Sequence, residues 1–375
     1  MFKNYKLRDY DFKLILMVLA LAAVGVIAIG SAEETLQTRQ LFGAVAGFIL
    51  MIALSFINYN SLLRLYWLIY GGNLTLLALV MFMGEKHKGA QRWVEIGSIT
   101  FQPSETAKIL LILFFAQFIM KYKEKLNTLK MLAACVVLIG IPWGFIYKQP
   151  DLSTSIMVLV LFCVILFAGG ISWKYIAGAL AVGIPALILL VSIAVQPDQT
   201  FLTTSQQNRI LSFINPEEYA TAEAYQQLNS VIAIGSGQLD GKGYKNNEIT
   251  SVKNGDFISE AQNDFIFSVI GEEFGFKGSV VVIVLMMGVA MECMAIARRA
   301  KDMAGRIIAA GMGGLIAFQS FINIGVATFI LPNTGLPLPF VSYGLTSLMS
   351  CFIGMGVVLN VRLQSGRNAL AAEGK

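Results

Sequence analysis

The sequence predicts an all-α, polytopic membrane protein. Of its 375 residues, 56% are hydrophobic and only 14% are charged, whereas about a quarter of the residues in an ordinary soluble domain carry a charge. Apolar runs of roughly 20 residues, the length that crosses ~30 Å of hydrocarbon, recur along the whole chain. This composition excludes a water-soluble globule, a disordered chain and a secreted module held together by disulfides.

Ten segments are expected to cross the bilayer. Because ten is even, both termini lie on one side of the membrane. Lys and Arg gather on that side, at the start of the chain and after the fourth and eighth segments, so the positive-inside rule places both termini in the cytoplasm. The ten segments are residues 12–31, 40–57, 62–83, 103–121, 128–147, 152–170, 174–195, 263–297, 304–330 and 342–361.

One large outer loop, residues 196–262, is expected between the seventh and eighth segments, within a single transmembrane domain formed by residues 1–375. The loop holds an acidic patch and a glycine-rich stretch, and a compact loop of this length is usually functional. All four cysteines lie in apolar runs and are expected to be buried. The single histidine, His87, argues against a histidine metal site, so we assign no metal ligands.

A charged pair opens the fourth expected span. Glu105 and Lys108 are three residues apart, so they share a helical face and can neutralise each other. One interpretation is a structural ion pair, because charges within a membrane are costly and are commonly paired. The other is that both groups face a polar cavity, and Pro103, a typical first-turn residue, would place them near the outer headgroups.

Two aspartates begin later spans. Asp151 is expected to be a helix N-cap, supported by Thr154, that can still face a cavity. Asp264 follows the long loop directly and lies among aromatic residues, where partial desolvation would raise its pKa toward that of a useful general base. The simpler interpretation of Asp264 is again an N-cap, with an i,i+4 pair between Glu273 and Lys277 further along the same helix.

Basic side chains in the expected outer loops could bind a phosphate or pyrophosphate. Arg92 and Arg209 each lie near an aromatic residue, so each could instead be an interfacial anchor. Arginine matches phosphate geometry, and Lys242 follows in a glycine-rich stretch where backbone N–H groups could help. Ser342 belongs to a proline-rich loop before the last span, which is expected to be rigid and to border a cavity. These four residues are the candidate substrate-binding residues.

Five stretches in the polar segments carry a family resemblance. They are GAQRWVEIGSITFQPSETAK, QPDLSTS, QNRILSFINPEE, NDFIFSVIGEEFG and LPNTGLPLPFVSYG, in this order. Together they resemble the SEDS family, named for shape, elongation, division and sporulation, and the resemblance covers essentially the whole chain. The opening NYKLRDYDF and the stretch QNRILSFINPEE are more similar to the RodA-like elongation members than to the division and sporulation members.

The resemblance implies a peptidoglycan glycosyltransferase that polymerises lipid II outside the cytoplasmic membrane, together with a class B penicillin-binding protein as transpeptidase. Two departures from the family pattern are Gln262–Asn263, where many members have His-Thr, and Gly344–Leu345, where many have Gly-Gly. By position, Asp264 matches the family's essential aspartate, Glu105 and Lys108 its charged pair, Asp151 its second aspartate, and Arg92 and Arg209 arginines of its outer cavity.

The implied mechanism is a single in-line displacement with inversion. Asp264 would accept the proton of the acceptor hydroxyl, and cationic groups would stabilise the departing undecaprenyl pyrophosphate. No cofactor is certain, and a divalent cation, Mg²⁺ or Mn²⁺, is left open. The four groups Glu105, Lys108, Asp151 and Asp264 are expected to line one outward-facing cavity, although they come from three spans.

A transporter that flips lipid-linked cell-wall precursors is the alternative function. Ten spans with charges inside the membrane suit a flippase as well. A flippase should have polar groups at the bilayer midplane or on both leaflets, whereas Glu105, Asp151 and Asp264 all fall in the outer third of the expected spans. A scaffold without activity would leave these clustered charges without a purpose.

Overall fold

Helices cover all ten segments expected to cross the membrane. The computed structural model describes residues 10–87, 90–96, 99–149, 151–196, 204–219, 224–245, 251 and 257–373. The helices are α1 (Phe12–Ala32), α2 (Glu34–Ser55), α3 (Tyr59–Leu63), α4 (Tyr66–Met83), α5 (Pro103–Lys121), α6 (Leu129–Lys148), α7 (Leu152–Ala168), α8 (Trp173–Ala194), α9 (Thr204–Ile214), α10 (Tyr225–Ser236), α11 (Ile266–Arg298), α12 (Met303–Ala327) and α13 (Leu345–Glu373).

The all-α membrane architecture is confirmed. Among the described residues, eight helices are long and apolar enough to cross a membrane: α1, α2, α4, α5, α6, α11, α12 and α13. Helix α7 is apolar but has 17 residues, and α8 has 22. The exact number of spans, the side on which the termini lie and the position of the 196–262 loop outside the cell stay predictions.

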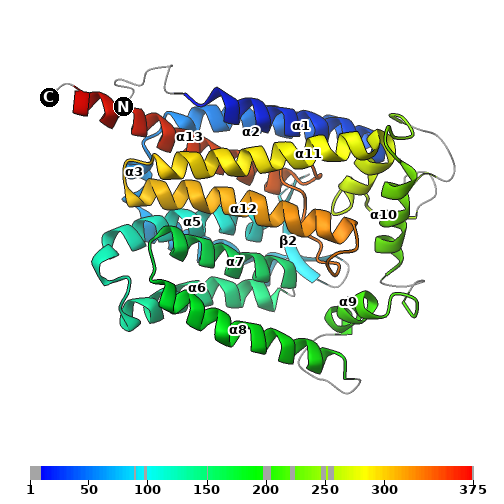
Figure 1. Cartoon of the computed structure of the whole chain (residues 1–375), viewed down its shortest axis with the longest axis horizontal. Helices are drawn as coiled ribbons and strands as arrows, with labels where there is room; N and C mark the ends of the chain where they lie inside the picture. Colours follow the sequence, from blue (N-terminus) through cyan, green and yellow to red (C-terminus); the bar gives the residue numbers. More distant parts are fainter. Residues whose placement is uncertain are drawn as a thin grey trace.

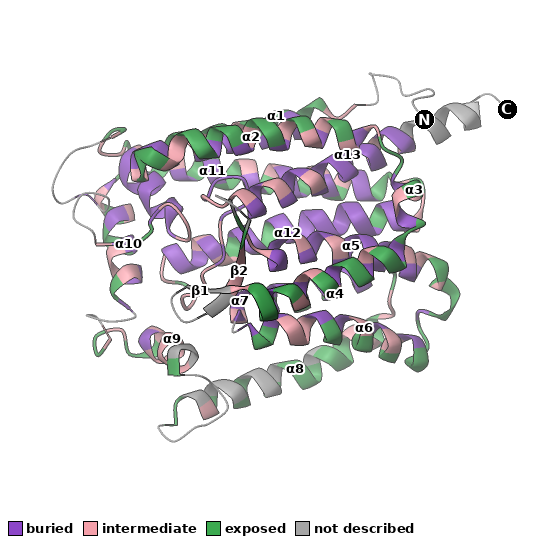
Figure 2. Cartoon of the chain, turned by 180° about the vertical axis from the view of Figure 1, so that it is seen from behind, coloured by how far each residue is buried: buried purple, intermediate pink, exposed green. Residues whose placement is uncertain are grey.

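Helices α5 and α12 form the centre of the bundle. Helix α12 packs against α5, α7, α11 and α13, and α5 packs against α4, α7, α12 and α13. Most of the surface of α5 and α12 is buried, whereas α8 and the outer faces of α1 and α2 are exposed (Figure 2). A helix that is apolar all round is typical of such a central position. The two helices therefore form the rigid part on which other segments are placed.

The two ends of the bundle differ. The start of α1 and the C-terminal part of α13 lie at one end, and α9 and α10 lie at the other (Figure 1). Helices α5, α7, α11 and α13 all begin at the end that carries α9 and α10 (Figure 1). The polar residues that open these helices are thereby gathered at one end of the molecule.

A small antiparallel sheet precedes α5, where only a loop was expected. It consists of β1 (Glu85–His87), β2 (Ala90–Ile96) and β3 (Ile99–Phe101), in that order. The register pairs Glu85 with Trp93 and Val94 with Phe101. The short apolar-polar-apolar alternations Val94–Ile96 and Ile99–Phe101 are the sequence signal that indicates strands here. The sheet matters because it carries Arg92.

The glycine-rich stretch after α10 packs against a break in α11. Gly275 interrupts α11 with a φ of +63°, and Gly241 lies against it with a φ of +81°. A Cβ on Gly241 would lie 2.1 Å from the carbonyl oxygen of Glu273. The expected pair between Glu273 and Lys277 is wrong, because Lys277 pairs with Asp240. The glycines thus allow two backbones to touch.

Because the two backbones lie so close together, one added methyl group at Gly241 should have a large effect on stability. Gly241→Ala should lower the thermal stability of the purified protein in detergent by about 1–3 kcal/mol, because the new Cβ meets backbone that has no room to move. Gly140→Ala in α6 is the control, because a Cβ there meets nothing within 4 Å. Equal midpoints of thermal unfolding for the two variants would contradict this account of the packing.

Candidate active site

A polar cavity of 430 Å³ opens where the helix starts converge. Its walls come from β2, the starts of α5, α7 and α13, helix α9 and the two connections that precede α11 and α13. Five of the eight candidate residues line it: Arg92, Glu105, Asp151, Arg209 and Asp264. Segments far apart in the sequence are therefore brought to one site.

The cavity lies at the amino ends of four helices. Gln102, Asp151 and Phe265 are the residues just before α5, α7 and α11, and Leu345 begins α13; all four line the cavity. The unpaired N–H groups at a helix start carry partial positive charge. These ends bring partial positive charge to the cavity, part of which is already matched by the carboxylates of Asp151 and Glu105.

Asp151 is both an N-cap and a cavity residue. Its side chain accepts hydrogen bonds from the backbone N–H of Thr154 at 3.2 Å and from the Thr154 hydroxyl at 2.9 Å. Arg92 approaches within 3.8 Å on the other side. The N-cap interpretation of Asp151 is therefore confirmed, and its carboxylate also helps to place Arg92.

Asp264 lies in the connection that leads into α11. Phe265, not Asp264, occupies the N-cap position, so the N-cap interpretation of Asp264 is wrong. Desolvation by the surrounding protein raises the pKa of Asp264 to about 6, with a smaller contribution from Glu260, whereas Arg209 and Arg92 act in the opposite direction. A carboxylate with a pKa close to neutral can accept a proton and release it again.

Two arginines face the same cavity from different elements. The Nε of Arg92 donates to the carbonyl oxygen of Gln149 at 3.3 Å, and Arg209 donates to that of Thr334 at 3.4 Å. Burial lowers the pKa of Arg209 below its ordinary value, and the charge of Arg92 lowers it further. Two guanidinium groups held near each other, beside four helix starts, suit a ligand with more than one negative charge.

Glu105 and Lys108 form a buried pair. Lys108 Nζ lies 2.7 Å from Glu105 Oε1, and the two residues are only 1% and 2% exposed, respectively. Lys108 also donates to Gln319 Oε1 at 2.8 Å. The structure brings Glu105 to the cavity wall and places Lys108 behind it, outside the lining. The ammonium group therefore contacts α12 and not the cavity.

Lys242 and Ser342 lie outside the cavity lining. Lys242 forms an ion pair with Glu272 at 2.8 Å, which fastens the glycine-rich stretch to α11. The Ser342 hydroxyl accepts a hydrogen bond from the backbone N–H of Leu338 at 2.7 Å, within the proline-rich connection. Their contact with substrate stays a prediction. Sequence reasoning missed several polar residues that do line the cavity, namely Gln102, Glu260, Asn263, Tyr343 and Thr346.

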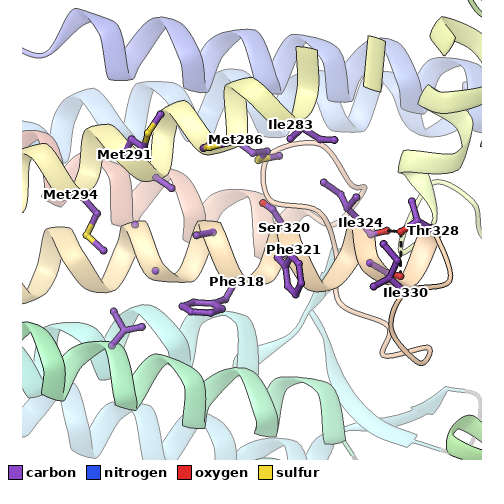
Figure 3. Close-up of a pocket in the computed structure, with 17 residues that line it drawn as sticks. Ile283, Met286, Met291, Met294, Phe318, Ser320, Phe321, Ile324, Thr328 and Ile330 are labelled. Atoms are coloured by element: carbon purple, nitrogen blue, oxygen red, sulfur yellow. Dashed lines mark hydrogen bonds between the residues drawn. The ribbon is translucent and has the colours of Figure 1, made fainter. Parts of the chain in front are cut away.

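A second cavity, of 540 Å³, is apolar and lies between α11 and α12. Its lining includes Met286 and Met291 of α11 and Phe318 and Phe321 of α12, with Ser320 as one of few polar groups (Figure 3). The residues lining this groove include no acid, base or cation. Of the two cavities, only the polar one is lined by groups that could transfer a proton or bind an anion.

The residues that the structure describes do not form a site for a resident metal ion. Within them, no group of three or more His, Cys, Asp or Glu side chains could hold a metal ion. Asp151, which lies 3.8 Å from Arg92, already accepts hydrogen bonds from Thr154. The expected divalent cation stays untested, and no step below is derived through it.

The fold and the cavity define a multi-pass membrane protein with a polar, charged site at one end of its helical bundle. A family model described as a cell cycle protein and named for FtsW, RodA and SpoVE matches residues 11–367. The chain belongs to this family, the SEDS family.

Individual relatives agree with this assignment. The chain is 33% identical over 373 residues to the probable peptidoglycan glycosyltransferase FtsW of Trichlorobacter lovleyi, covering 96% of this chain and 94% of the relative. It is 33% identical over 357 residues to the peptidoglycan glycosyltransferase MrdB of Escherichia coli K12, covering 94% and 93%. A solved structure that concerns polymerization and crosslinking by a peptidoglycan synthase complex matches with a TM-score of 0.78 at 31% identity, covering 95% and 98%.

The buried pair predicts an asymmetric response to charge exchange. Each single change, Glu105→Lys or Lys108→Glu, leaves an uncompensated buried charge and should cost about 3–5 kcal/mol of stability. The double exchange should recover much of that stability. It should not recover peptidoglycan glycosyltransferase activity, because a carboxylate at position 108 no longer donates to Gln319.

The control for this exchange is a pair on the surface. Lys277 and Asp240 form an ion pair whose side chains are 64% and 72% exposed, so their exchange should leave both thermal stability and activity close to the parent values. Activity of the 105/108 exchange near the parent level, measured as polymer yield per folded protein, would show that the buried pair is only structural.

Proposed function

We propose that this chain polymerises lipid II into β-1,4-linked glycan strands during cell elongation. Its enzyme class is that of a peptidoglycan glycosyltransferase, as its relatives are named. The observation that carries the proposal is the cavity that holds Asp264, with a pKa of about 6, beside Arg92 and Arg209. The elongation role rests on two sequence stretches, NYKLRDYDF and QNRILSFINPEE, which are more similar to the RodA-like elongation members than to the other members of the family.

The proposed reaction is one displacement at the anomeric carbon of the donor sugar. The donor is held by undecaprenyl pyrophosphate in α linkage and the product is β-linked, so one inversion is sufficient. The 4-hydroxyl oxygen of the acceptor N-acetylglucosamine forms the new bond as the bond to the pyrophosphate oxygen breaks. Asp264 takes the hydroxyl proton, and the electron pair of the broken bond leaves with the pyrophosphate.

The leaving group requires charge stabilisation and not a proton. Pyrophosphate is already a good leaving group, so a general acid is unnecessary. Arg92 and Arg209, together with the helix starts around the cavity, are suited to stabilise the charge that develops on it. In this proposal Lys108 does not contact the substrate. It lies behind Glu105 and supports the cavity wall through its hydrogen bond to Gln319.

In this proposal a divalent cation, Mg²⁺ or Mn²⁺, would bind together with the substrate. Mg²⁺ usually keeps several waters and binds substrate phosphates with one or two carboxylates. The ion would therefore arrive on the pyrophosphate and add to the positive charge of the arginines there. A chelator added to the purified protein and lipid II tests this part separately from the role of Asp264.

The partner and the side of the membrane are also proposed. A class B penicillin-binding protein would crosslink the strands that this chain polymerises, and the similar solved structure concerns a complex that coordinates these two activities. The cavity lies at the end of the bundle opposite the start of α1, so cytoplasmic termini place the active site on the outer face (Figure 1). This position suits a flippase less well, because such a protein needs polar groups along its whole path.

The base assignment predicts a specific loss of activity. Asp264→Asn keeps the size of the side chain but cannot accept the proton, so polymer yield from lipid II should fall by ~10²-fold or more while the protein still folds. Asp302→Asn is the control, because Asp302 is an N-cap at the opposite end of the bundle and asparagine caps equally well. Near-parent polymer from Asp264→Asn would refute the assignment.

The pH dependence should report the same group. Asp264 is active when deprotonated, so kcat/KM should fall as the pH decreases through about 6, well above the ordinary range of an aspartate. The charge of Arg209 lowers this pKa and that of Glu260 raises it. Arg209→Gln should therefore move the acidic limb to higher pH, and Glu260→Gln to lower pH. Movement of both variants in the same direction would contradict Asp264 as the titrating base.

A further inference from the structure

Two buried amides on α12 lie directly behind the cavity. Gln319 and Asn323 are one turn apart and each is only 1% exposed. Asn323 Nδ2 donates to the carbonyl oxygen of Asp264 at 2.7 Å and to that of Leu336 at 2.7 Å. Carbonyl oxygens only accept, so the amide nitrogen must face them and the orientation of the side chain is determined.

This arrangement leaves a polar atom unsatisfied. The Oδ1 of Asn323 is buried and has no hydrogen-bond partner among the residues that the structure describes. An unpaired buried acceptor costs about 1–3 kcal/mol. A leucine of similar size would suit an apolar helix core better. The asparagine is therefore best explained by the two hydrogen bonds of its Nδ2, which join the backbone of Asp264 to the backbone of Leu336 in the facing wall of the cavity.

Gln319 links the Glu105–Lys108 pair to the same wall of the cavity. Its Oε1 accepts from Lys108 Nζ at 2.8 Å, and its Nε2 donates to the carbonyl oxygen of Pro337 at 2.9 Å. A continuous chain of contacts thus runs from Glu105 through Lys108 and Gln319 to the cavity wall. The buried pair can influence the cavity without contacting a ligand.

The wall that these amides hold has no regular hydrogen-bonding of its own. Residues 332–338 form neither helix nor strand. The carbonyl oxygen of Thr334 accepts from Arg209 and from Ser153. Gly335 has a φ of +78° and approaches so closely that a Cβ there would lie 3.2 Å from Asp264 Oδ2. Small shifts of this segment would therefore change the surroundings of the Asp264 carboxylate.

We propose that Asn323 is a positioning residue for Asp264, and that Gln319 and Lys108 hold the facing wall in place beside it. The two amides fix the distance between the base and segment 332–338 by binding three backbone carbonyl groups, those of Asp264, Leu336 and Pro337. Asn323 itself does not touch the substrate. This inference rests on the proposed function, in which Asp264 is the general base.

The test compares Asn323→Leu with a matched control, Asn360→Leu. Asn360 is also fully buried and forms two hydrogen bonds to backbone, with Tyr59 and Ser55, and accepts a third from Gln364, but it lies on α13 away from the cavity lining. Both variants lose one buried amide, and Asn360→Leu should lower the thermal stability at least as much as Asn323→Leu. Only Asn323→Leu should lower kcat, by ~10-fold or more, with KM for lipid II changed less than about twofold.

The pH profile distinguishes positioning from general destabilisation. A loosened Asp264 gains contact with water, which lowers its pKa, so the acidic limb of Asn323→Leu should move below the parent value of about 6. Asn360→Leu should leave the limb in place. Asn323→Gln keeps the amide donors and should recover part of kcat. Equal losses in both leucine variants, with no movement of the limb, would overturn the inference.

Hydrogen–deuterium exchange gives a readout that does not depend on activity. Asn323→Leu should speed amide exchange in residues 257–265 and 332–344, whereas Asn360→Leu should not. Parent protein that makes no polymer would refute the proposed function alone, and exchange would still test the inference. Unchanged exchange in both segments would refute the positioning role even if the parent is active. Should Asn323→Leu fail to fold, the same measurements on Asn323→Gln against the parent apply.

Discussion

Hydrocarbon solvates neither charges nor unpaired peptide groups, and the position of each polar group in this protein follows from that constraint. The buried ion pair of Glu105 and Lys108 is satisfied within the bundle, where Gln319 accepts the further hydrogen bond of the ammonium group. The irregular backbone of residues 332–338 is tolerated because side chains from α9, α7 and α12 bind its carbonyl groups. Among the described residues, such polar groups border space for a ligand at the polar cavity.

The central helices α5 and α12 hold the polar groups that they carry in fixed positions. Helices α5 and α12 pack against each other and against α7 and α13, so their inner surfaces cannot shift independently. Glu105 lies on α5 and Asn323 lies on α12. Because Asp264, the proposed base, is held to α12 by its backbone carbonyl, its carboxylate is left available for the proposed proton transfer.

Much of this could be predicted from the sequence, because hydropathy and helix-start residues are local signals. The ten helical segments and the cluster of Glu105, Asp151 and Asp264 follow from them. The sheet was missed because its alternating stretches are only three residues long. The break at Gly275 could not be predicted, since it depends on contact with Gly241 in a distant segment. The ion pair of Lys242 with Glu272 could not be predicted either, because the two residues lie 30 positions apart in the sequence. Asn323 had a signal that was overlooked: an amide four residues after another in an apolar span.

The base and the cations are held by different parts of the molecule. Asp264 is fixed to the central α12, whereas Arg209 belongs to α9, whose main contacts are with the exposed α8. A stacked pair of Phe213 and Phe329, with ring centroids 5.7 Å apart, and the bond to Thr334 link α9 to the far wall of the cavity. Proton transfer needs an exact geometry, while a guanidinium can follow a pyrophosphate as it departs. A rigid base beside a less tightly packed cation matches these two demands.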